Sequence, residues 1–157
     1  MYKKIAAILA FILLLTCSLA TVSFADAESE NKVVYLDENG NEIMTPRWSY
    51  VSTTGIALSF NNGRVYMDAN INGNNSCAYI TARAQLEKKD ANGNYSVVIT
   101  YLDLTTKNTD MPQDFNFNRN RLASVNDSYR FTVAATVYGK DGGSEPITLQ
   151  TTGTYYP

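Results

Sequence analysis

Two short loops repeat one pattern of oxygen-bearing side chains. Residues 37–41 read DENGN and residues 90–95 read DANGNY, so both contain Asp-x-Asn-Gly-Asn. Such oxygens are calcium ligands, but an EF-type loop also needs glycine at its sixth position and a bidentate acid at its twelfth. Those positions hold Glu42 and Trp48 in the first loop, and Tyr95 and Tyr101 in the second. Because Asn-Gly is a strong hairpin signal, we predict two turns and no metal site.

The sequence lacks the side chains that most enzymes use. It contains no histidine, which excludes Ser-His-Asp and Cys-His catalysis and histidine-based metal sites. Paired carboxylates remain as an acid/base option. Most acids fall in predicted turns or near the N-terminus, namely Asp37, Glu38, Glu42, Asp90, Asp127, Asp141 and Glu145, whereas Asp68 and Glu87 fall on predicted strands. No spacing places two of them together, so we predict no catalytic residue and no cofactor.

Cys77 is the one cysteine outside the first 25 residues. It is the first residue of a predicted strand and lies on the opposite face of that strand from Ile80 and Leu86. The polar loop 72–76 precedes it. A small hydrophobic side chain at the end of a sheet is the favoured interpretation. An intermolecular disulfide and a reactive thiol remain the alternatives.

Residues 110–122, DMPQDFNFNRNRL, form one candidate binding surface. Phe115 and Phe117 alternate with asparagine, and Arg119 and Arg121 follow. Aromatic faces beside amide and guanidinium donors suit a sugar- or peptide-binding loop. The alternative, which we favour, is that both phenyl rings cap the open edge of the fold.

Three tyrosines form a second candidate surface. Tyr66, Tyr79 and Tyr138 lie on predicted strands, opposite the aliphatic positions. On an exposed sheet they would form a contact surface, whereas a second layer over them would make them ordinary core. The alternation cannot decide between these outcomes.

Alternating apolar residues predict six strands, at 53–60, 65–71, 78–86, 95–101, 129–138 and 146–152. Further short strands are expected at 33–36 and 102–106. Turns that pair glycine with asparagine or aspartate separate several of them. The sequence therefore predicts an all-β antiparallel sandwich of about seven or eight strands at 47–157, after a polar N-terminal arm at 26–46 with a possible hairpin. Residues 107–128 lack strand alternation and are predicted to cross between the sheets.

Residues 1–25 have the features of a secretory signal peptide. Lys3 and Lys4 precede the apolar run at 5–15, and Ser23 and Ala25 occupy the −3 and −1 positions of a cleavage site. The apolar run is shorter than the about 20 residues of a membrane span. A lipoprotein signal ending at Cys17 is the alternative. We therefore expect a cleaved signal helix, an extracellular product and no stable membrane anchor.

Two resemblances extend this prediction. Residues 129–153 resemble the last hairpin of a fibronectin type III or immunoglobulin-like module, which implies that Tyr129 bonds back to the chain as a tyrosine corner. Across about residues 40–157, the segments PRWSYVSTTGIALSF, 61–101 and YRFTVAATVYGKDGGSE are similar to a family of small secreted proteins of unknown function from Gram-positive bacteria. That resemblance implies export and a compact β fold.

Charge narrows the choice of partner. Acidic residues outnumber basic ones, 15 to 13, and loss of Lys3 and Lys4 would widen the difference. No basic stripe for nucleic acid is present. We expect a secreted, non-catalytic module that binds an extracellular glycan, a cell-wall polymer or a protein. The alternatives are a bacteriocin-like effector and an acid/base hydrolase.

Overall fold

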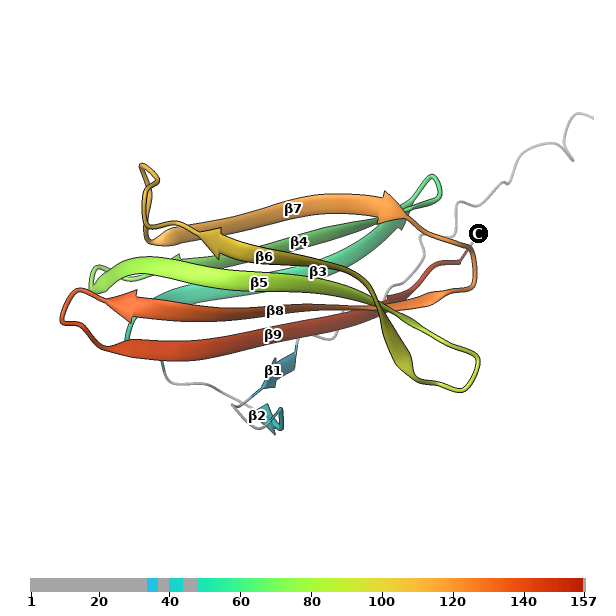
Figure 1. Cartoon of the computed structure of the whole chain (residues 1–157), viewed down its shortest axis with the longest axis horizontal. Helices are drawn as coiled ribbons and strands as arrows, with labels where there is room; N and C mark the ends of the chain where they lie inside the picture. Colours follow the sequence, from blue (N-terminus) through green and yellow to red (C-terminus); the bar gives the residue numbers. More distant parts are fainter. Residues whose placement is uncertain (1–33, 37–39, 44–47, 157) are drawn as a thin grey trace, which may run out of the picture.

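The computed structural model describes residues 34–36, 40–43 and 48–156, and the signal peptide predicted at 1–25 and most of the predicted arm lie outside them. These residues form nine strands (Figure 1), which are β1 Val34–Leu36, β2 Glu42–Ile43, β3 Val51–Asn61, β4 Arg64–Gly73, β5 Cys77–Lys89, β6 Tyr95–Thr105, β7 Asp114–Leu122, β8 Ser128–Gly139 and β9 Ser144–Thr154. The described residues contain no helix long and apolar enough to cross a membrane.

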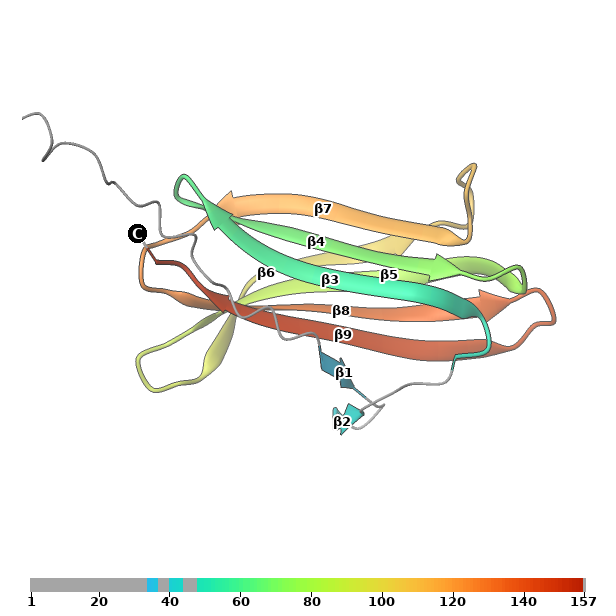
Figure 2. The same ribbon diagram turned by 180° about the vertical axis from the view of Figure 1, so that it is seen from behind.

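The strands form two antiparallel sheets that pack face to face. Sheet A has the order β2-β1-β9-β8-β5-β6, and sheet B has the order β3-β4-β7. Figure 1 shows sheet A in front, and Figure 2 shows sheet B in front. The predicted all-β sandwich is therefore confirmed, with each of the six predicted strands present. Residues 34–36, from the predicted arm, extend sheet A beside β9.

Alternation along each strand builds the core between the sheets. Inward side chains from sheet A include Leu86, Phe131 and Val133, and those from sheet B include Leu58 and Met67; each of these is fully buried. The outward residues of the same strands are largely polar. One face of each sheet is therefore left to solvent, and these two faces are where a ligand can be met.

The turns follow the predicted chemistry. Asn62 and Gly63 both have positive φ, at 48° and 71°, as a two-residue hairpin between β3 and β4 requires. In the DANGN loop, the Asp90 carboxylate accepts hydrogen bonds from the backbone N–H groups of Asn92 (2.9 Å) and Asn94 (2.8 Å). This loop is a turn, as predicted. Asp37 in the other loop lies outside the described residues.

Tyr129 forms the expected corner. The backbone N–H of Ser124 donates to its hydroxyl at 3.1 Å, five residues upstream. The ring is buried where the chain passes from β7 to β8, the position at which immunoglobulin-like folds place this bond. The prediction is confirmed.

The prediction that 107–128 contains no strand is wrong. Residues 114–122 form β7, which pairs along its length with β4 and forms one edge of sheet B. Asparagine has low β propensity, and the segment holds only two aromatic residues, so its alternation did not indicate a strand. The chain does cross between sheets here, before and after β7.

Strict alternation along 95–101 would place Tyr95, Val97, Ile99 and Tyr101 on one face of β6, and this expectation is wrong in part. Ile99 and Tyr101 pack on the core, but Val97 is 58% exposed. The register against β5 shifts between the pairs Leu86–Ile99 and Glu87–Val97, which marks a β-bulge. A bulge adds one residue and moves the following side chains to the other face.

Candidate functional site

The outer face of sheet B carries cross-strand rows of amide and carboxylate side chains. Strand register sets Gly55 beside Asn70 and Asn116 in one row, and Ala57 beside Asp68 and Asn118 in the next. These six residues, together with Arg119, line an open groove of about 660 Å³, which we term the amide groove. The small residues on β3 leave room above the sheet, and β4 and β7 supply the polar groups. Figure 2 shows these three strands in front.

The row through Gly55 contains two free amides. Within the described part of the chain, the side chains of Asn70 and Asn116 have no hydrogen-bond partner. A Cβ on Gly55 would lie 2.5 Å from Oδ1 of Asn70, so only glycine leaves space for this amide over β3. Each amide offers a carbonyl acceptor and two N–H donors. The row therefore presents donors and acceptors side by side to solvent.

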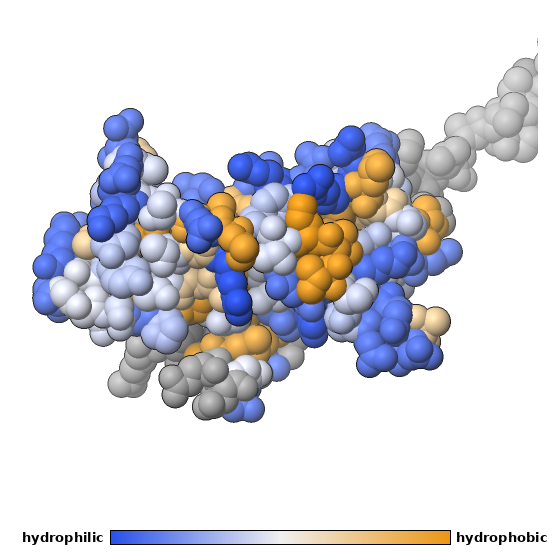
Figure 3. Space-filling model, in the orientation of Figure 1, coloured by the Kyte–Doolittle hydropathy of each residue, from blue (hydrophilic) through white to orange (hydrophobic). Residues whose placement is uncertain are grey.

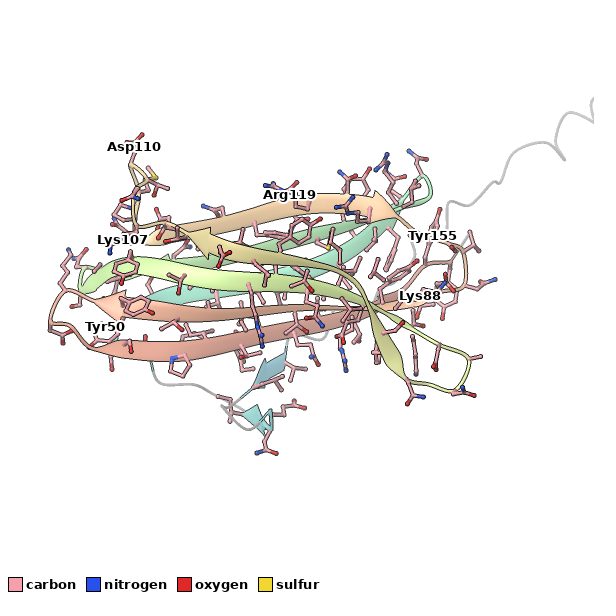
Figure 4. All side chains as sticks on the ribbon, viewed as in Figure 1. Tyr50, Lys88, Lys107, Asp110, Arg119 and Tyr155 are labelled. Carbon is pink, nitrogen blue, oxygen red and sulfur yellow. The ribbon has the colours of Figure 1, made fainter. Side chains whose placement is uncertain are left out.

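The other polar side chains of the amide groove, Asp68, Asn118 and Arg119, form contacts within the protein. Asn118 donates a short hydrogen bond to Asp68, which fixes both side chains. Arg119 donates to the backbone carbonyl of Asn118 at 2.7 Å, and its guanidinium lies 5.7 Å from the Phe117 ring centroid. Figure 4 shows Arg119 along β7. The one acid and the one base leave the amide groove without net charge.

Tyr66 lies on the same outer face, one row beyond Asp68. Its register partners are Ser59 on β3 and Asn120 on β7. The ring is half-buried, so part of its surface faces solvent beside the amide groove. An aromatic ring next to polar groups is what a sugar ring packs against with its C–H groups.

The residues predicted from segment 110–122 separate into two groups. Phe115 and Phe117 face the core and are buried, so they do not reach a ligand in solvent. Arg119 and Arg121 are exposed at the seam between β7 and β6, with Arg121 5.9 Å from the Tyr101 ring centroid. Tyr101 in turn meets Phe117 edge to face at 5.1 Å.

Tyr79 and Tyr138 lie on the other outer face of the molecule, that of sheet A. They are directly paired across β5 and β8, and their rings stack at 4.5 Å with an interplanar angle of 15°. Lys107 lies 5.1 Å from the Tyr79 centroid. No described strand covers this pair, and Tyr66 lies on the opposite side of the sandwich.

Cys77 lies at the start of β5 and is buried, as the favoured interpretation predicted. Burial raises the pKa of its thiol, which keeps it protonated and unreactive at neutral pH. A Cβ on Gly73 would lie 2.6 Å from its Sγ, so this thiol fills the space beside β4.

Tyr50 forms hydrogen bonds to two carboxylates, those of Asp141 and Glu145. Figure 4 labels Tyr50 at one end of the molecule. The Tyr50 hydroxyl donates to both oxygens of Asp141, at 2.9 and 3.0 Å, and Glu145 accepts from the backbone N–H groups of Ser49 and Tyr50. A hydrogen bond from the Gly143 N–H, followed by that from Tyr50, lowers the pKa of Asp141. These contacts tie the start of β3 to the β8–β9 turn.

Sequence reasoning identified Tyr66 and Arg119 but missed the asparagines of the amide groove. Their signal was present, because residues 68 and 70 and residues 116 and 118 alternate with apolar positions. The register between β4 and β7 cannot be read from either strand alone, so the sequence did not show that these side chains lie side by side.

Comparison with known proteins identifies no family for this chain. No family model matches it, and no curated protein matches it. Among solved structures, the crystal structure of chicken MD-1 complexed with lipid IVa aligns with 80% of this chain and 99% of that chain, at 6% identity and a TM-score of 0.26. Nothing about MD-1 is transferred to this chain at that level. The resemblance to a secreted bacterial family stays a prediction.

Proposed function

We propose that this protein is an exported, non-catalytic module that binds a neutral polysaccharide in the amide groove. The observation behind this proposal is the pair of free amides, Asn70 and Asn116, presented beside Gly55 on an exposed sheet face. Vicinal sugar hydroxyls both donate and accept, and an asparagine amide does the same within one side chain. The sequence features of the first 25 residues support export.

A neutral glycan suits the lining better than a protein does. Protein interfaces depend on large anchors, chiefly tryptophan, tyrosine and arginine, packed in a dry centre. The outward side chains of the amide groove are instead amides, one carboxylate and two small residues, with Tyr66 at one end. Asp68 and Arg119 balance in charge, so the lining favours no ionic ligand.

Binding without catalysis is supported by three described acids that are used within the fold. Glu87 forms a two-point ion pair with Arg130, Asp127 pairs with Lys88, and Asp141 bonds to Tyr50. The pKa values of Asp127 and Asp141 are lowered, whereas a general acid needs a raised one.

The test is a screen of residues 26–157 against soluble neutral polysaccharides, such as β-glucans, mannans and dextran, by affinity electrophoresis. We expect at least one to bind and to be recovered uncleaved. Asn70→Ala and Asn116→Ala each remove an amide that has no partner among the described residues, so each variant should bind about tenfold more weakly while unfolding at the same urea concentration.

The matched control is Asn108→Ala, an exposed asparagine in the turn after β6. It should leave binding unchanged. Equal losses in all three variants, no binding to any neutral polysaccharide, or cleavage of the bound polymer would each contradict the proposal.

A further inference from the structure

The outer face of sheet A holds a second groove, on the opposite side of the molecule from the amide groove. Its lining includes Arg83 on β5, Asp103 on β6, Ala134 on β8 and Thr148 on β9, and its volume is about 700 Å³. The small Ala134 side chain lies between Arg83 and Thr148 in one cross-strand row, which lowers the floor. We term it the Arg83 groove. Figure 3 shows this face, with the pale and blue surface of polar residues beside apolar patches.

A bulge in β6 raises one wall of the Arg83 groove. The register against β5 shifts between the pairs Ala82–Leu104 and Ala84–Tyr101, and Asp103 has a positive φ of 54°. Leu102 is 64% exposed at this bulge. An irregularity of this kind costs backbone energy and re-aims side chains, which is common beside binding sites.

Arg83 is a cation without a counter-ion. It is exposed, and among the described residues it has no hydrogen bond, ion pair or ring contact. Asp103 lines the same groove, yet no ion pair joins the two. Arg130, two rows along the same face, shows the contrast, since it bonds to Glu87 at 2.6 and 3.0 Å and stacks on Tyr95 at 4.1 Å. The free guanidinium fork of Arg83 matches a carboxylate, sulfate or phosphate.

The stacked tyrosines lie at one end of the Arg83 groove. Tyr79, Thr81 and Arg83 alternate along one face of β5, so about 13 Å separates the Cα atoms of Tyr79 and Arg83. Lys107 adds a second cation at the tyrosine end. An aromatic pair, hydroxyl side chains and a free guanidinium thus lie along a line that two or three sugar rings would span.

We propose that the Arg83 groove binds a segment of an acidic polysaccharide. An anionic group of the polymer pairs with Arg83, a second lies near Lys107, and a sugar ring packs against Tyr138. Asp103 and Thr136 accept hydrogen bonds from the sugar hydroxyls. Asp103 is the unpaired acid in the groove lining, and no ion pair joins it to Arg83. The free guanidinium fork of Arg83 therefore selects an acidic polymer over a neutral one.

The experiment measures binding of residues 26–157 to polygalacturonate, dextran sulfate and phosphomannan, with a neutral polysaccharide that did not bind in the amide-groove screen as the uncharged reference. These probes separate carboxylate, sulfate and phosphodiester sources of the charge. We expect at least one anionic polymer to bind, and affinity to fall as salt screens the interaction. Arg83→Ala should weaken that binding about tenfold or more, and Arg83→Lys should restore part of it.

The matched control is Arg121→Ala, an exposed arginine at the seam of the sandwich that leaves the net charge equal to that of Arg83→Ala. It should bind the polyanion as the unchanged protein does. Because Arg83 has no partner among the described residues, its removal should leave the unfolding curve unchanged.

Equal losses from Arg83→Ala and Arg121→Ala would show non-specific attraction and overturn the proposal. Absence of binding to all three polyanions, or capture of a protein through this face alone, would also overturn it. Asn70→Ala should leave polyanion binding intact. The proposal for the Arg83 groove and the proposal for the amide groove can therefore be refuted independently.

Discussion

At the residue scale, side chains with specific partners distinguish structural from ligand-binding roles. Tyr129 and Arg130 are fully engaged within the protein, whereas the amides of Asn70 and Asn116 and the guanidinium of Arg83 are not. A polar group that folding leaves without a protein partner costs little in water and is available to a ligand. This distinction supports both proposed sites.

Removal of the Tyr129 hydroxyl should destabilise the fold. Tyr129→Phe leaves the backbone N–H of Ser124 without its acceptor, and we expect a loss of about 1 kcal/mol in the free energy of unfolding by urea titration. Tyr66→Phe is the control, since its hydroxyl has no partner in the described residues, and it should be neutral. A neutral Tyr129→Phe would show that the corner contributes nothing.

Gly55→Ala should separate binding from folding. The added Cβ displaces the Asn70 amide from its place over β3 but meets only the end of a flexible side chain. We expect weaker binding of the neutral polysaccharide and an unchanged or higher urea midpoint, because alanine in a strand loses less backbone entropy than glycine. Unchanged binding would remove Asn70 from the site.

Stability should decline on acidification through the paired carboxylates. The hydrogen bond and charge of Lys88 lower the pKa of Asp127 below its usual 3.8. A folded-state pKa below the unfolded one means that the contribution is present above pH 3.8 and is lost as the pH falls through the folded pKa. In urea titrations at decreasing pH, the free energy of unfolding of Asp127→Asn should fall less steeply than that of the unchanged protein. An equally steep fall in both proteins would contradict this account.

At the element scale, the edge strands explain where prediction from sequence succeeded and failed. Strands β4, β5 and β8 were predicted because their inward positions are uniformly aliphatic or aromatic. Strand β7 was missed because only Phe115 and Phe117 mark its buried face, and asparagine and arginine fill the remainder. Two bulges in β6 break the strict alternation, so the sequence did not predict which of its side chains face the core. The pairing of Tyr79 with Tyr138 and of Asn70 with Asn116 depends on register, which no single strand encodes.

Strand β7 should contribute to stability through its phenyl rings. Phe115→Ala and Phe117→Ala each remove a buried ring, and each should cost about 3–5 kcal/mol in the free energy of unfolding. Arg121→Ala on the same strand should cost far less. Loss of ligand binding with an unchanged unfolding curve would instead make these rings part of a site.

At the scale of the whole molecule, the sandwich separates two chemically different faces. Sheet B presents a neutral amide groove, and sheet A presents a groove centred on a free cation, on opposite sides of one core. Paired strands form the floor of each groove, and the β6 bulge adds one wall to the Arg83 groove. Strand pairing sets the spacing of the outward side chains, and a regular spacing suits a repetitive polymer.

The fold should not depend on a bound cation. The described residues contain no group of three or more acids, cysteines or histidines that would hold a metal ion, and Asp90 is used by its own turn. We expect EDTA to leave the melting temperature unchanged. A drop of several degrees that added calcium reverses would overturn the turn assignment.

Chemical-shift mapping tests the central claim most directly. Titration of the 15N-labelled protein with the neutral oligosaccharide found in the screen should shift resonances of β3, β4 and β7, led by the side-chain amides of Asn70 and Asn116. Resonances of Arg83, Tyr79 and Tyr138 should stay in place. Shifts confined to sheet A, or spread over the β6–β7 seam without the two asparagines, would contradict the amide groove as the site.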